Sequence, residues 1–247
     1  SIFDDALLKS VTVRVLIDCA NGATSALVNT FRYNSNFVLT NVSPTGFNIN
    51  LKCGALEPDS LQRRLVSEDF DVGASFDGDG DRVIFATKEY GVLSAEQTAL
   101  LFYHHLSKKF SKYTVVTSEI VNRSFAENLR KMGGKLIEVD VGDRYVINEV
   151  DRLDALFGFE PSGHFYLPHI GKTMDGLASL SLFLETYKTQ INSRALDLTK
   201  MESFVRVTKN YDLDGLSSTF DLEDLQTKIY PVFNSSEEKL IIRQSMW

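Results

Sequence analysis

Three aspartates at alternate positions, Asp77, Asp79 and Asp81, follow an apolar run and are separated only by glycines. Carboxylates spaced in this way can converge on one point only where the chain bends sharply, and Gly78 and Gly80 can adopt the positive φ values that such a bend requires. Three converging carboxylates repel one another unless a cation lies between them, and hard oxygen ligands select Mg²⁺ or Ca²⁺. This stretch therefore predicts a divalent-metal loop.

Residues 77–82, called the aspartate loop below, end in Arg82, which places a fixed positive charge beside the predicted metal. An ordinary surface turn is one alternative, because Asp-Gly repeats are common in turns. It stays open, although a turn rarely needs three aspartates and an arginine directly after an apolar strand. An EF-hand is excluded: with Asp77 as its first position, its glycine position holds Arg82 and its glutamate position holds Lys88.

A second group of polar side chains, Glu160, Ser162 and His164, alternates around Gly163 at the end of a short apolar run. A carboxylate, a hydroxyl and an imidazole together offer hydrogen-bond donors and acceptors, which suits a ligand with several hydroxyl groups. The alternative, equally open, is a turn in which Ser162 and Glu160 cap the adjoining backbone. Both interpretations place these residues on a loop at the carboxyl end of a strand.

Gly142, Asp143 and Arg144 are predicted to begin a helix. Backbone N–H groups at a helix start attract anions, and a guanidinium can pair with a carboxylate or a phosphate. Asp143 can equally be the N-cap of that helix, so both roles stay open. Near the end of the chain, Arg243 and Ser245 follow an apolar strand and would suit a phosphate in the same way.

Strand-like apolar runs alternate with helical patterns in the first part of the chain, which predicts a βαβαβ unit with a parallel sheet. Ligands on such sheets gather outside the carboxyl ends of the strands, where the aspartate loop falls. A capping box formed by Ser94 and Gln97 opens a further helix to about residue 110. The expected strands are 11–18, 37–42 and 71–76, with a helix to about Phe31, a helix from Pro58, and a hairpin of 82–86 with 91–93.

The same alternation returns after residue 113, which predicts a second parallel-sheet unit. We therefore expect an α/β fold of two successive parallel-sheet domains, residues 1–110 and 111–192, followed by a partial C-terminal α+β segment, residues 193–247. The expected strands of the second domain are 114–117, 135–139 and 156–159, and its expected helices are 123–132, one that begins at 141–145, and 177–187. The expected elements of the C-terminal segment are strands 204–208 and 239–242 and a helix near 222–227.

The composition is that of an ordinary globular protein, with 43% hydrophobic and 24% charged residues among 247. A net charge of −7 argues against nucleic acid as the main partner, because a phosphate backbone requires a basic face. The sequence contains neither an apolar run long enough to cross a membrane nor a charged and then apolar leader. Cys19 and Cys53 are too few for a disulfide framework, so we expect a reduced, cytoplasmic protein.

Together these motifs resemble the α-D-phosphohexomutases. Residues 76–82 are similar to the family's metal-binding loop, and residues 160–164 are similar to its sugar-recognition loop. Residues 175–176 resemble the Asp-Gly step that follows that loop, while Arg243 and Ser245 resemble the start of the phosphate-binding loop. The family fold has four domains around a central cleft, and the chain resembles the second, the third and part of the fourth.

Within the family the chain looks most like the phosphoglucosamine mutases, through residues 48–50, 53–54 and 141–146. Pro161 departs from the polar residue usual there, so phosphomannomutase/phosphoglucomutase activity stays an alternative. The resemblance implies reversible transfer of a phosphoryl group between positions 6 and 1 of a hexosamine phosphate, through a phosphoserine and a sugar bisphosphate. A non-catalytic protein that only binds metal and sugar phosphate is the third hypothesis.

The resemblance also implies roles for individual residues. Asp77, Asp79 and Asp81 would hold Mg²⁺, and Arg82, as a catalytic residue, would stabilise the charge on the transferring phosphoryl group. The oligomeric state is not predicted, and the expected partner is a hexose or hexosamine phosphate. The expected substrate-binding residues are Glu160, Ser162, His164, Gly142, Asp143, Arg144, Arg243 and Ser245.

Two features of the family pattern are missing from the chain. No Ser-His-Asn-Pro type sequence that could serve as the phosphoserine loop occurs in it. Met246 and Trp247 stand where the phosphate-binding loop would continue through Gly and Thr. We therefore expect the chain to be a piece of such an enzyme and to be inactive by itself.

Overall fold

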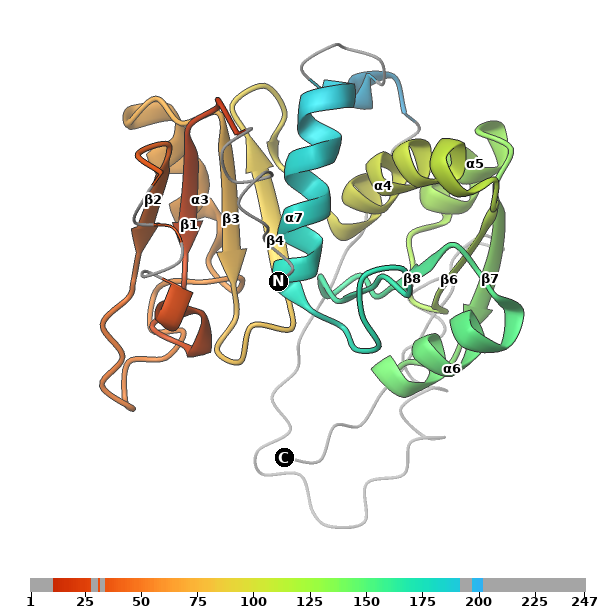
Figure 1. The fold of residues 1–247 in the computed structure, drawn as a ribbon, viewed down its shortest axis with the longest axis horizontal. Helices are drawn as coiled ribbons and strands as arrows, with labels where there is room; N and C mark the ends of the chain where they lie inside the picture. Colours follow the sequence, from red (N-terminus) through yellow and green to blue (C-terminus); the bar gives the residue numbers. More distant parts are fainter. Residues whose placement is uncertain (1–10, 28–30, 32–33, 192–196, 202–247) are drawn as a thin grey trace, which may run out of the picture. The chain divides into compact units, whose positions relative to one another are not determined.

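The computed structural model describes residues 11–27, 31, 34–191 and 197–201 (Figure 1). The chain divides into two compact units, residues 1–204 and 205–247, and all described residues belong to the first unit. Arg243, Ser245 and the elements predicted from residue 204 onward therefore lie outside the described residues. The domain boundaries predicted at residues 110 and 192 stay predictions.

Five strands form the first sheet: β1 (Val15–Asp18), β2 (Phe37–Thr40), β3 (Val72–Phe76), β4 (Val83–Thr87) and β5 (Gly91–Val92). Their order is β2-β1-β3-β4-β5. β1 runs parallel to β2 and β3, as predicted, whereas β4 and β5 form the predicted hairpin and β4 pairs with β3 in antiparallel fashion. The sheet is therefore mixed, because residues 77–82 are too few for a parallel crossover, which needs about a dozen residues or more.

The two faces of the first sheet pack against different layers, because alternate side chains of a strand point to opposite sides. On one face, Leu16 of β1 packs with Leu61 and Leu65 of α3 (Pro58–Ser67). On the other face, Ile17 belongs to the main core of the unit. Both faces are covered, which explains why β1 and β3 are buried along their whole length.

The helix predicted after β1 begins as a 3₁₀ turn, Ala23–Leu27, and not as an α-helix. The N–H of Ala23 donates to the carbonyl of Gly78 in the aspartate loop, at 2.8 Å. Further along, Phe31 is fully buried and its ring lies 4.8 Å from that of Phe37 in β2. Residues 23–27 and residue 31 are thus helical, in agreement with the short helix predicted to about Phe31, and the contact with Gly78 anchors its first turn.

Four strands form the second sheet: β6 (Thr114–Ser118), β7 (Lys135–Val139), β8 (Phe157–Phe159) and β9 (Phe165–Tyr166). Their order is β7-β6-β8-β9. β6 is parallel to β7 and β8, as predicted, and β9 is antiparallel to β8. The sequence analysis did not predict β9, because a strand of two residues is too short to show a periodic pattern.

The remaining helices of the described part are α4 (Ala95–Phe110), α5 (Arg123–Lys131), α6 (Asp143–Leu153) and α7 (Gly176–Thr186), followed by a π-turn (Tyr187–Ile191) and a 3₁₀ turn (Leu198–Lys200). The capping box of α4 is confirmed. The Ser94 hydroxyl accepts from the N–H of Gln97 (3.1 Å), and the Gln97 side-chain oxygen accepts from the N–H of Ser94 (2.9 Å). None of the described helices is both long and apolar enough to cross a membrane.

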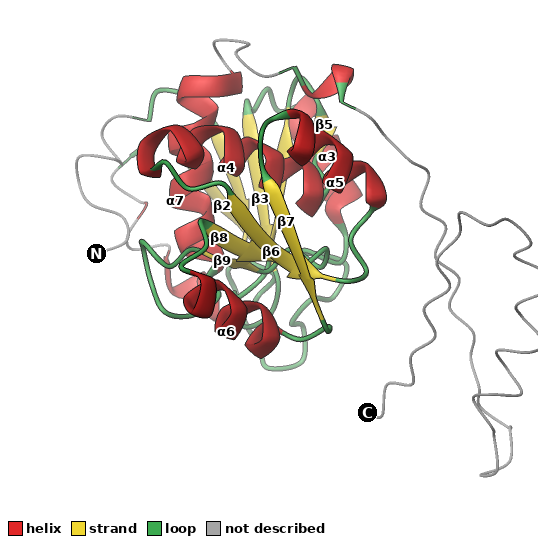
Figure 2. Ribbon diagram, turned by 90° about the vertical axis from the view of Figure 1, so that its right-hand side faces the viewer, coloured by secondary structure: helices red, strands yellow, loops and turns green. Residues whose placement is uncertain are grey.

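Helices cover both faces of the second sheet, with α6 on one side and α4 and α5 on the other (Figure 2). On the α6 side, Val116 of β6 packs with Val146 and Val150. On the opposite side, the ring of Phe125 in α5 lies 4.9 Å from that of Phe159 in β8. The second sheet therefore lies between two helical layers, as expected for a parallel α/β unit.

Helix α7 packs against both β4 and α4 (Figure 1). Phe183 of α7 stacks on Phe85 of β4, with the ring centroids 4.1 Å apart and the ring planes at 2°. Phe102 of α4 meets Phe85 edge-on, at 6.5 Å between centroids. All three rings are fully buried, so one apolar core continues from the first sheet to the helices of the second.

The substitution Phe183→Ala should lower the free energy of unfolding by about 3–5 kcal/mol, because it removes a fully buried ring and leaves a cavity. Urea unfolding followed by circular dichroism measures this change. Phe47→Ala is the matched control, since the Phe47 side chain is 96% exposed and its loss should cost less than about 0.5 kcal/mol. Equal stability of the two variants would contradict a core that passes through α7.

Candidate metal centre

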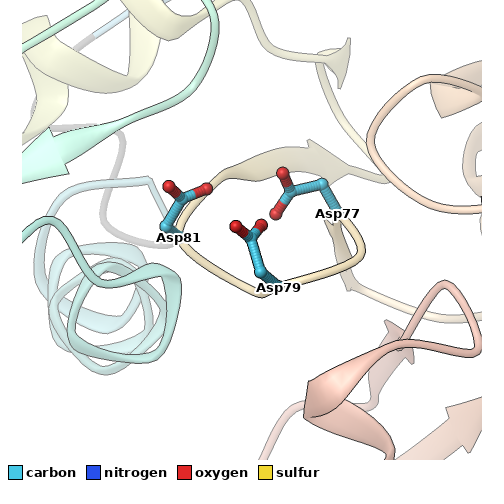
Figure 3. A group of neighbouring side chains, drawn as sticks. All are labelled: Asp77, Asp79 and Asp81. Carbon is cyan, nitrogen blue, oxygen red and sulfur yellow. The ribbon is translucent and has the colours of Figure 1, made fainter. Parts of the chain in front are cut away.

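The aspartate loop lies at the carboxyl end of β3, at the edge of the sheet where β1 and β2 also end. Asp77, Asp79 and Asp81 each offer an oxygen within 4.8 Å of the others. Figure 3 shows the three side chains rising from one loop with their carboxyl groups close together. Asp77 is buried, Asp81 is half-buried and Asp79 is exposed. The convergence predicted from the spacing is therefore present.

The two glycines of the loop serve different purposes. Gly80 has a φ of +84°, which confirms the bend predicted there. The prediction of a positive φ is wrong for Gly78, which is absent from the positive-φ residues of the described chain. A Cβ at Gly78 would instead lie 2.6 Å from Cγ2 of Ile49. Gly78 is thus needed for close approach of another loop rather than for an unusual backbone angle.

The buried carboxylate of Asp77 is held by three hydrogen bonds. Its Oδ1 accepts from the N–H groups of Gly80 (3.1 Å) and Arg82 (3.2 Å), and its Oδ2 accepts from Nε of Arg82 (2.6 Å). Burial alone would raise the pKa of Asp77, but the hydrogen bonds and charge of Arg82 outweigh burial and hold this pKa below its usual value. A carboxylate has about four lone-pair sites, so one site on Oδ2 stays available for a further ligand.

The pKa of Asp81 is shifted in the opposite direction, above its usual value. Burial raises the pKa of its carboxyl group, the nearby His164 imidazole lowers this pKa in part, and the negative charges of Asp77 and Asp79 raise it again. The three carboxylates therefore repel one another, and a bound cation would relieve this repulsion. Three hard oxygen donors on one loop fit a cation such as Mg²⁺, which Asp77, Asp79 and Asp81 would hold.

The loop of residues 160–164, called the sugar loop below, lies directly beside the aspartate loop. Arg82 and His164 form an antiparallel β-bridge, and the N–H of Val83 donates to the carbonyl of Gly163 (3.1 Å). Nε2 of His164 lies 3.3 Å from Oδ1 of Asp81, and Nδ1 lies 2.8 Å from the Ser162 hydroxyl. Two motifs that are far apart in the sequence thus form one continuous surface.

Glu160 connects the sugar loop to the third motif. This carboxylate is buried, its Oε1 accepts from the N–H of Gly142 (3.0 Å), and its Oε2 lies 3.6 Å from Nδ1 of His164. Glu160 thus accepts from a backbone N–H that lies 18 residues away, at the start of α6, and not from the adjoining backbone of its own turn. The chain of contacts runs from the start of α6 through Glu160 and His164 to Asp81.

The N-cap prediction for Asp143 is wrong, because Gly142 occupies the N-cap position of α6 with a φ of 137°. Asp143 is the first helical residue, and its Oδ1 accepts from the N–H of Arg144 (2.6 Å). The Arg144 guanidinium lies 4.8 Å from the centre of the Tyr145 ring and donates to its hydroxyl (2.9 Å). Arg144 therefore lies exposed at the margin of the site, next to Gly142 and Glu160 but directed to Tyr145.

Two further contacts at this site involve residues outside the main motifs. The N–H of Gly176, the first residue of α7, donates to the carbonyl of Gly80 (3.1 Å), so the Asp-Gly step at 175–176 touches the aspartate loop. Asp18, at the end of β1, is a buried carboxylate at the same edge of the sheet. The sequence analysis missed Asp18, because a single aspartate at the end of a strand has no spacing that sets it apart.

Comparison with known proteins shows which family this chain resembles. Residues 94–203 match the family described as phosphoglucomutase/phosphomannomutase, alpha/beta/alpha domain III. Over 232 residues the chain is 31% identical to the phosphoglucosamine mutase of Limosilactobacillus fermentum, covering 92% of this chain and 50% of that protein. The chain belongs to the α-D-phosphohexomutase superfamily. This phosphohexomutase chain spans about half the length of the curated relatives it matches.

Solved structures of the superfamily have the same fold. A phosphoglucomutase/phosphomannomutase family protein from Burkholderia thailandensis superposes with a TM-score of 0.63 at 22% identity, over 73% of this phosphohexomutase chain and 42% of that one. N-acetylphosphoglucosamine mutase of Aspergillus fumigatus was solved in complex with GlcNAc-6P and magnesium. It superposes with a TM-score of 0.58 at 19% identity, over 74% of this chain and 45% of that one. At these identities the likeness concerns the fold alone.

Proposed function

We propose that this chain forms the metal-binding and sugar-recognition part of a phosphoglucosamine mutase, which interconverts glucosamine 6-phosphate and glucosamine 1-phosphate. The observation that carries the proposal is the contact between the two loops, with Nε2 of His164 3.3 Å from Oδ1 of Asp81. A phosphohexomutase must hold a sugar beside the metal that assists phosphoryl transfer. The relative from Limosilactobacillus fermentum bears the same enzyme name over most of this chain.

Asp77, Asp79 and Asp81 would hold Mg²⁺, the ion present in the Aspergillus fumigatus complex with a sugar phosphate. When bound, Mg²⁺ offsets negative charge on the phosphoryl group that is transferred. The chain's own contribution is an oriented set of acceptors, because hydrogen bonds from Gly80 and Arg82 orient the carboxylate of Asp77. Ca²⁺ would fit the same oxygens, but its longer bonds and larger shell suit phosphoryl transfer less well.

Arg82 is proposed as a catalytic residue, because its side chain is partly exposed (35%) and its guanidinium is anchored by Asp77 through Nε. This geometry leaves other N–H groups of Arg82 to stabilise charge on the phosphoryl oxygens. In the sugar loop, the hydroxyl of Ser162 and the imidazole of His164 would bind sugar hydroxyls. Glu160 uses one oxygen for Gly142, and its second oxygen would accept a sugar hydroxyl.

The reaction itself would proceed in two transfers. A phosphoserine passes its phosphoryl group to the 1-hydroxyl of glucosamine 6-phosphate, giving the 1,6-bisphosphate and a free serine. The bisphosphate then returns its other phosphoryl group to that serine, so that the serine is again phosphorylated and glucosamine 1-phosphate leaves. We propose that this serine lies outside these 247 residues, because they contain no sequence of the phosphoserine type.

A substrate comparison tests the proposed function. The full-length protein that contains these residues should turn over glucosamine 6-phosphate with Mg²⁺ at a higher kcat/KM than mannose 6-phosphate or glucose 6-phosphate. A preference for mannose or glucose phosphates would instead assign phosphomannomutase/phosphoglucomutase activity, which Pro161 leaves open. No turnover of any of these sugars, with Mg²⁺ still bound, would identify a non-catalytic binding protein.

The 247-residue chain by itself should show no measurable mutase turnover, because it would lack the phosphoryl donor. The assay uses glucosamine 6-phosphate, Mg²⁺ and a trace of the bisphosphate, with the full-length protein as the positive control. Binding of Mg²⁺ to the short chain should persist, since the three aspartates are all present. Turnover by the purified short chain would disprove the claim that the serine lies elsewhere.

A further inference from the structure

Asp18 is a buried charge that the proposed chemistry does not use. It is only 3% exposed and ends strand β1, where it is paired in register with Ser75 of β3. Ser75 lies two residues before the first aspartate of the aspartate loop. A carboxylate is costly to bury unless N–H groups or cations compensate its charge, so its partners indicate what it does.

Three N–H groups from three different segments converge on this carboxylate. Oδ1 of Asp18 accepts from the backbone N–H of Ala20 (2.9 Å) and from Nδ2 of Asn41 (2.9 Å). Oδ2 accepts from the backbone N–H of Gly54 (3.0 Å). Asp18 thus joins the loops that follow β1 and β2 to the long connection before α3, all at the edge of the sheet that carries the aspartate loop.

The first path from Asp18 to the aspartate loop passes through Gly54. The next residue, Ala55, donates its N–H to the carbonyl of Phe76 (2.9 Å), and Phe76 directly precedes Asp77. A Cβ at Gly54 would lie 2.7 Å from that same carbonyl oxygen and 2.6 Å from Cβ of Ala20. Gly54 is therefore held tightly between the end of β3 and the segment that Asp18 orients.

The second path passes through Ala20. The carbonyl of Ala20 accepts from the N–H of Asn50 (2.9 Å). Asn50 and its neighbour Ile49 pack on Gly78 of the aspartate loop, where a Cβ would meet Cγ2 of Ile49 at 2.6 Å and Nδ2 of Asn50 at 3.2 Å. The two paths reach the aspartate loop at different points, its beginning and its second residue.

The segments on these paths have unfavourable backbone angles. Ala20, Asn21 and Asn50 have φ values of 53°, 50° and 58°, and Gly54 has a φ of 80°. Left-handed conformations are uncommon for residues with a side chain and persist only where the surroundings compensate for them. The hydrogen bond from Ala20 to Asp18 is one such compensation.

We propose that Asp18 is a positioning residue that holds the aspartate loop in the geometry in which its three carboxylates converge. The role of that convergence in metal binding rests on the proposed function, whereas the mechanical link rests on the hydrogen bonds themselves. Partners that orient metal ligands strongly affect metal affinity.

The variant Asp18→Asn tests the proposal, because it keeps the size of the side chain. An amide has one oxygen and one NH₂ group, so in either orientation its NH₂ faces at least one N–H that Asp18 now accepts. The matched control is Asn36→Ala, at the other end of the same sheet, where Nδ2 of Asn36 donates to the carbonyl of Val11 (2.8 Å). Both variants lose a hydrogen bond between two segments, but only the bonds of Asp18 lead to the aspartate loop.

Hydrogen exchange without metal is the first measurement. Amide exchange in residues 77–82 should be about tenfold faster in Asp18→Asn than in the parent chain, and unchanged in Asn36→Ala once compared at equal global stability. The expected acceleration extends to Gly54 and Ala55. Parent-like exchange of residues 77–82 in Asp18→Asn, or the same acceleration in Asn36→Ala, would overturn the proposal.

Titration with Mg²⁺, followed by calorimetry on the same chains, is the second measurement. Asp18→Asn should weaken Mg²⁺ binding by about 10–100-fold, as expected when a partner that orients metal ligands is changed, while Asn36→Ala should stay within about twofold. Unchanged Mg²⁺ affinity in Asp18→Asn would overturn the positioning role. A parent chain that does not bind Mg²⁺ would instead overturn the proposed metal function, and the exchange measurement would still decide the role of Asp18.

Discussion

Replacing Asp79 by alanine should nearly abolish the Mg²⁺-dependent turnover of the full-length protein while leaving its stability almost unchanged. Asp79 is exposed, so its side chain contributes little to the packing of the loop. Its carboxylate is nevertheless one of three that converge. Loss of one contact to a charged partner costs about 1.5–3 kcal/mol, or roughly 10–150-fold in rate, and loss of the ion itself costs more.

Three quantities are measured for the variant and for the parent: kcat/KM for glucosamine 6-phosphate, the Mg²⁺ dissociation constant and the urea midpoint of unfolding. Asp59→Ala is the control, since Asp59 is also exposed but lies in the first turn of α3. It should keep both activity and Mg²⁺ affinity. If Asp79→Ala retained near-parental activity at the same Mg²⁺ concentration, the assignment of the aspartate loop as the metal site would be wrong.

The substitution Gly22→Ala should displace the aspartate loop, although Gly22 itself lies in the turn after β1. A Cβ at Gly22 would lie 2.2 Å from the carbonyl oxygen of Gly78 and 2.8 Å from its Cα. Both are backbone atoms, which cannot rotate away as a flexible side chain would. We expect a loss of about 1–3 kcal/mol in the free energy of unfolding, and weaker Mg²⁺ binding because Gly78 must move.

Urea unfolding and Mg²⁺ titration of the same preparation measure the two effects of Gly22→Ala. Gly171→Ala serves as the control, because a Cβ at Gly171 would have no heavy atom of the described residues within 4 Å. Its stability and Mg²⁺ affinity should match those of the parent. A Gly22→Ala chain with parental values for both would show that the turn after β1 and the aspartate loop are not packed as closely as the structure indicates.

The parts of the site that could be predicted from the sequence depend on short-range spacing. Asp77, Asp79 and Asp81 lie within one loop, so the bend between them is enough to bring their oxygens together. The capping box of Ser94 and Gln97 is equally local, and it forms as predicted. The strands β1 and β6 are marked by β-branched residues, which are enriched in strands, and both form where they were predicted.

The positive φ suggested for Gly78 and the N-cap role suggested for Asp143 were wrong for a common reason. In both cases a group distant in the sequence determines the local structure, and at Gly78 this group is the side chain of Ile49, which packs on it. At the start of α6, Glu160 accepts from the N–H of Gly142 and leaves Asp143 inside the helix. Local propensity is a weak guide where such contacts act.

By itself, the sequence determined the α/β class, the aspartate loop and the polar character of the sugar loop, because these follow from residue types a few positions apart. Only the tertiary structure decided that the two loops touch, through Asp81 and His164, and that Asp18 lies beneath the first of them. Such contacts depend on strand order and on where each strand ends. Neither is contained in the periodicity of a single strand or helix, since they arise only when the strands assemble into sheets.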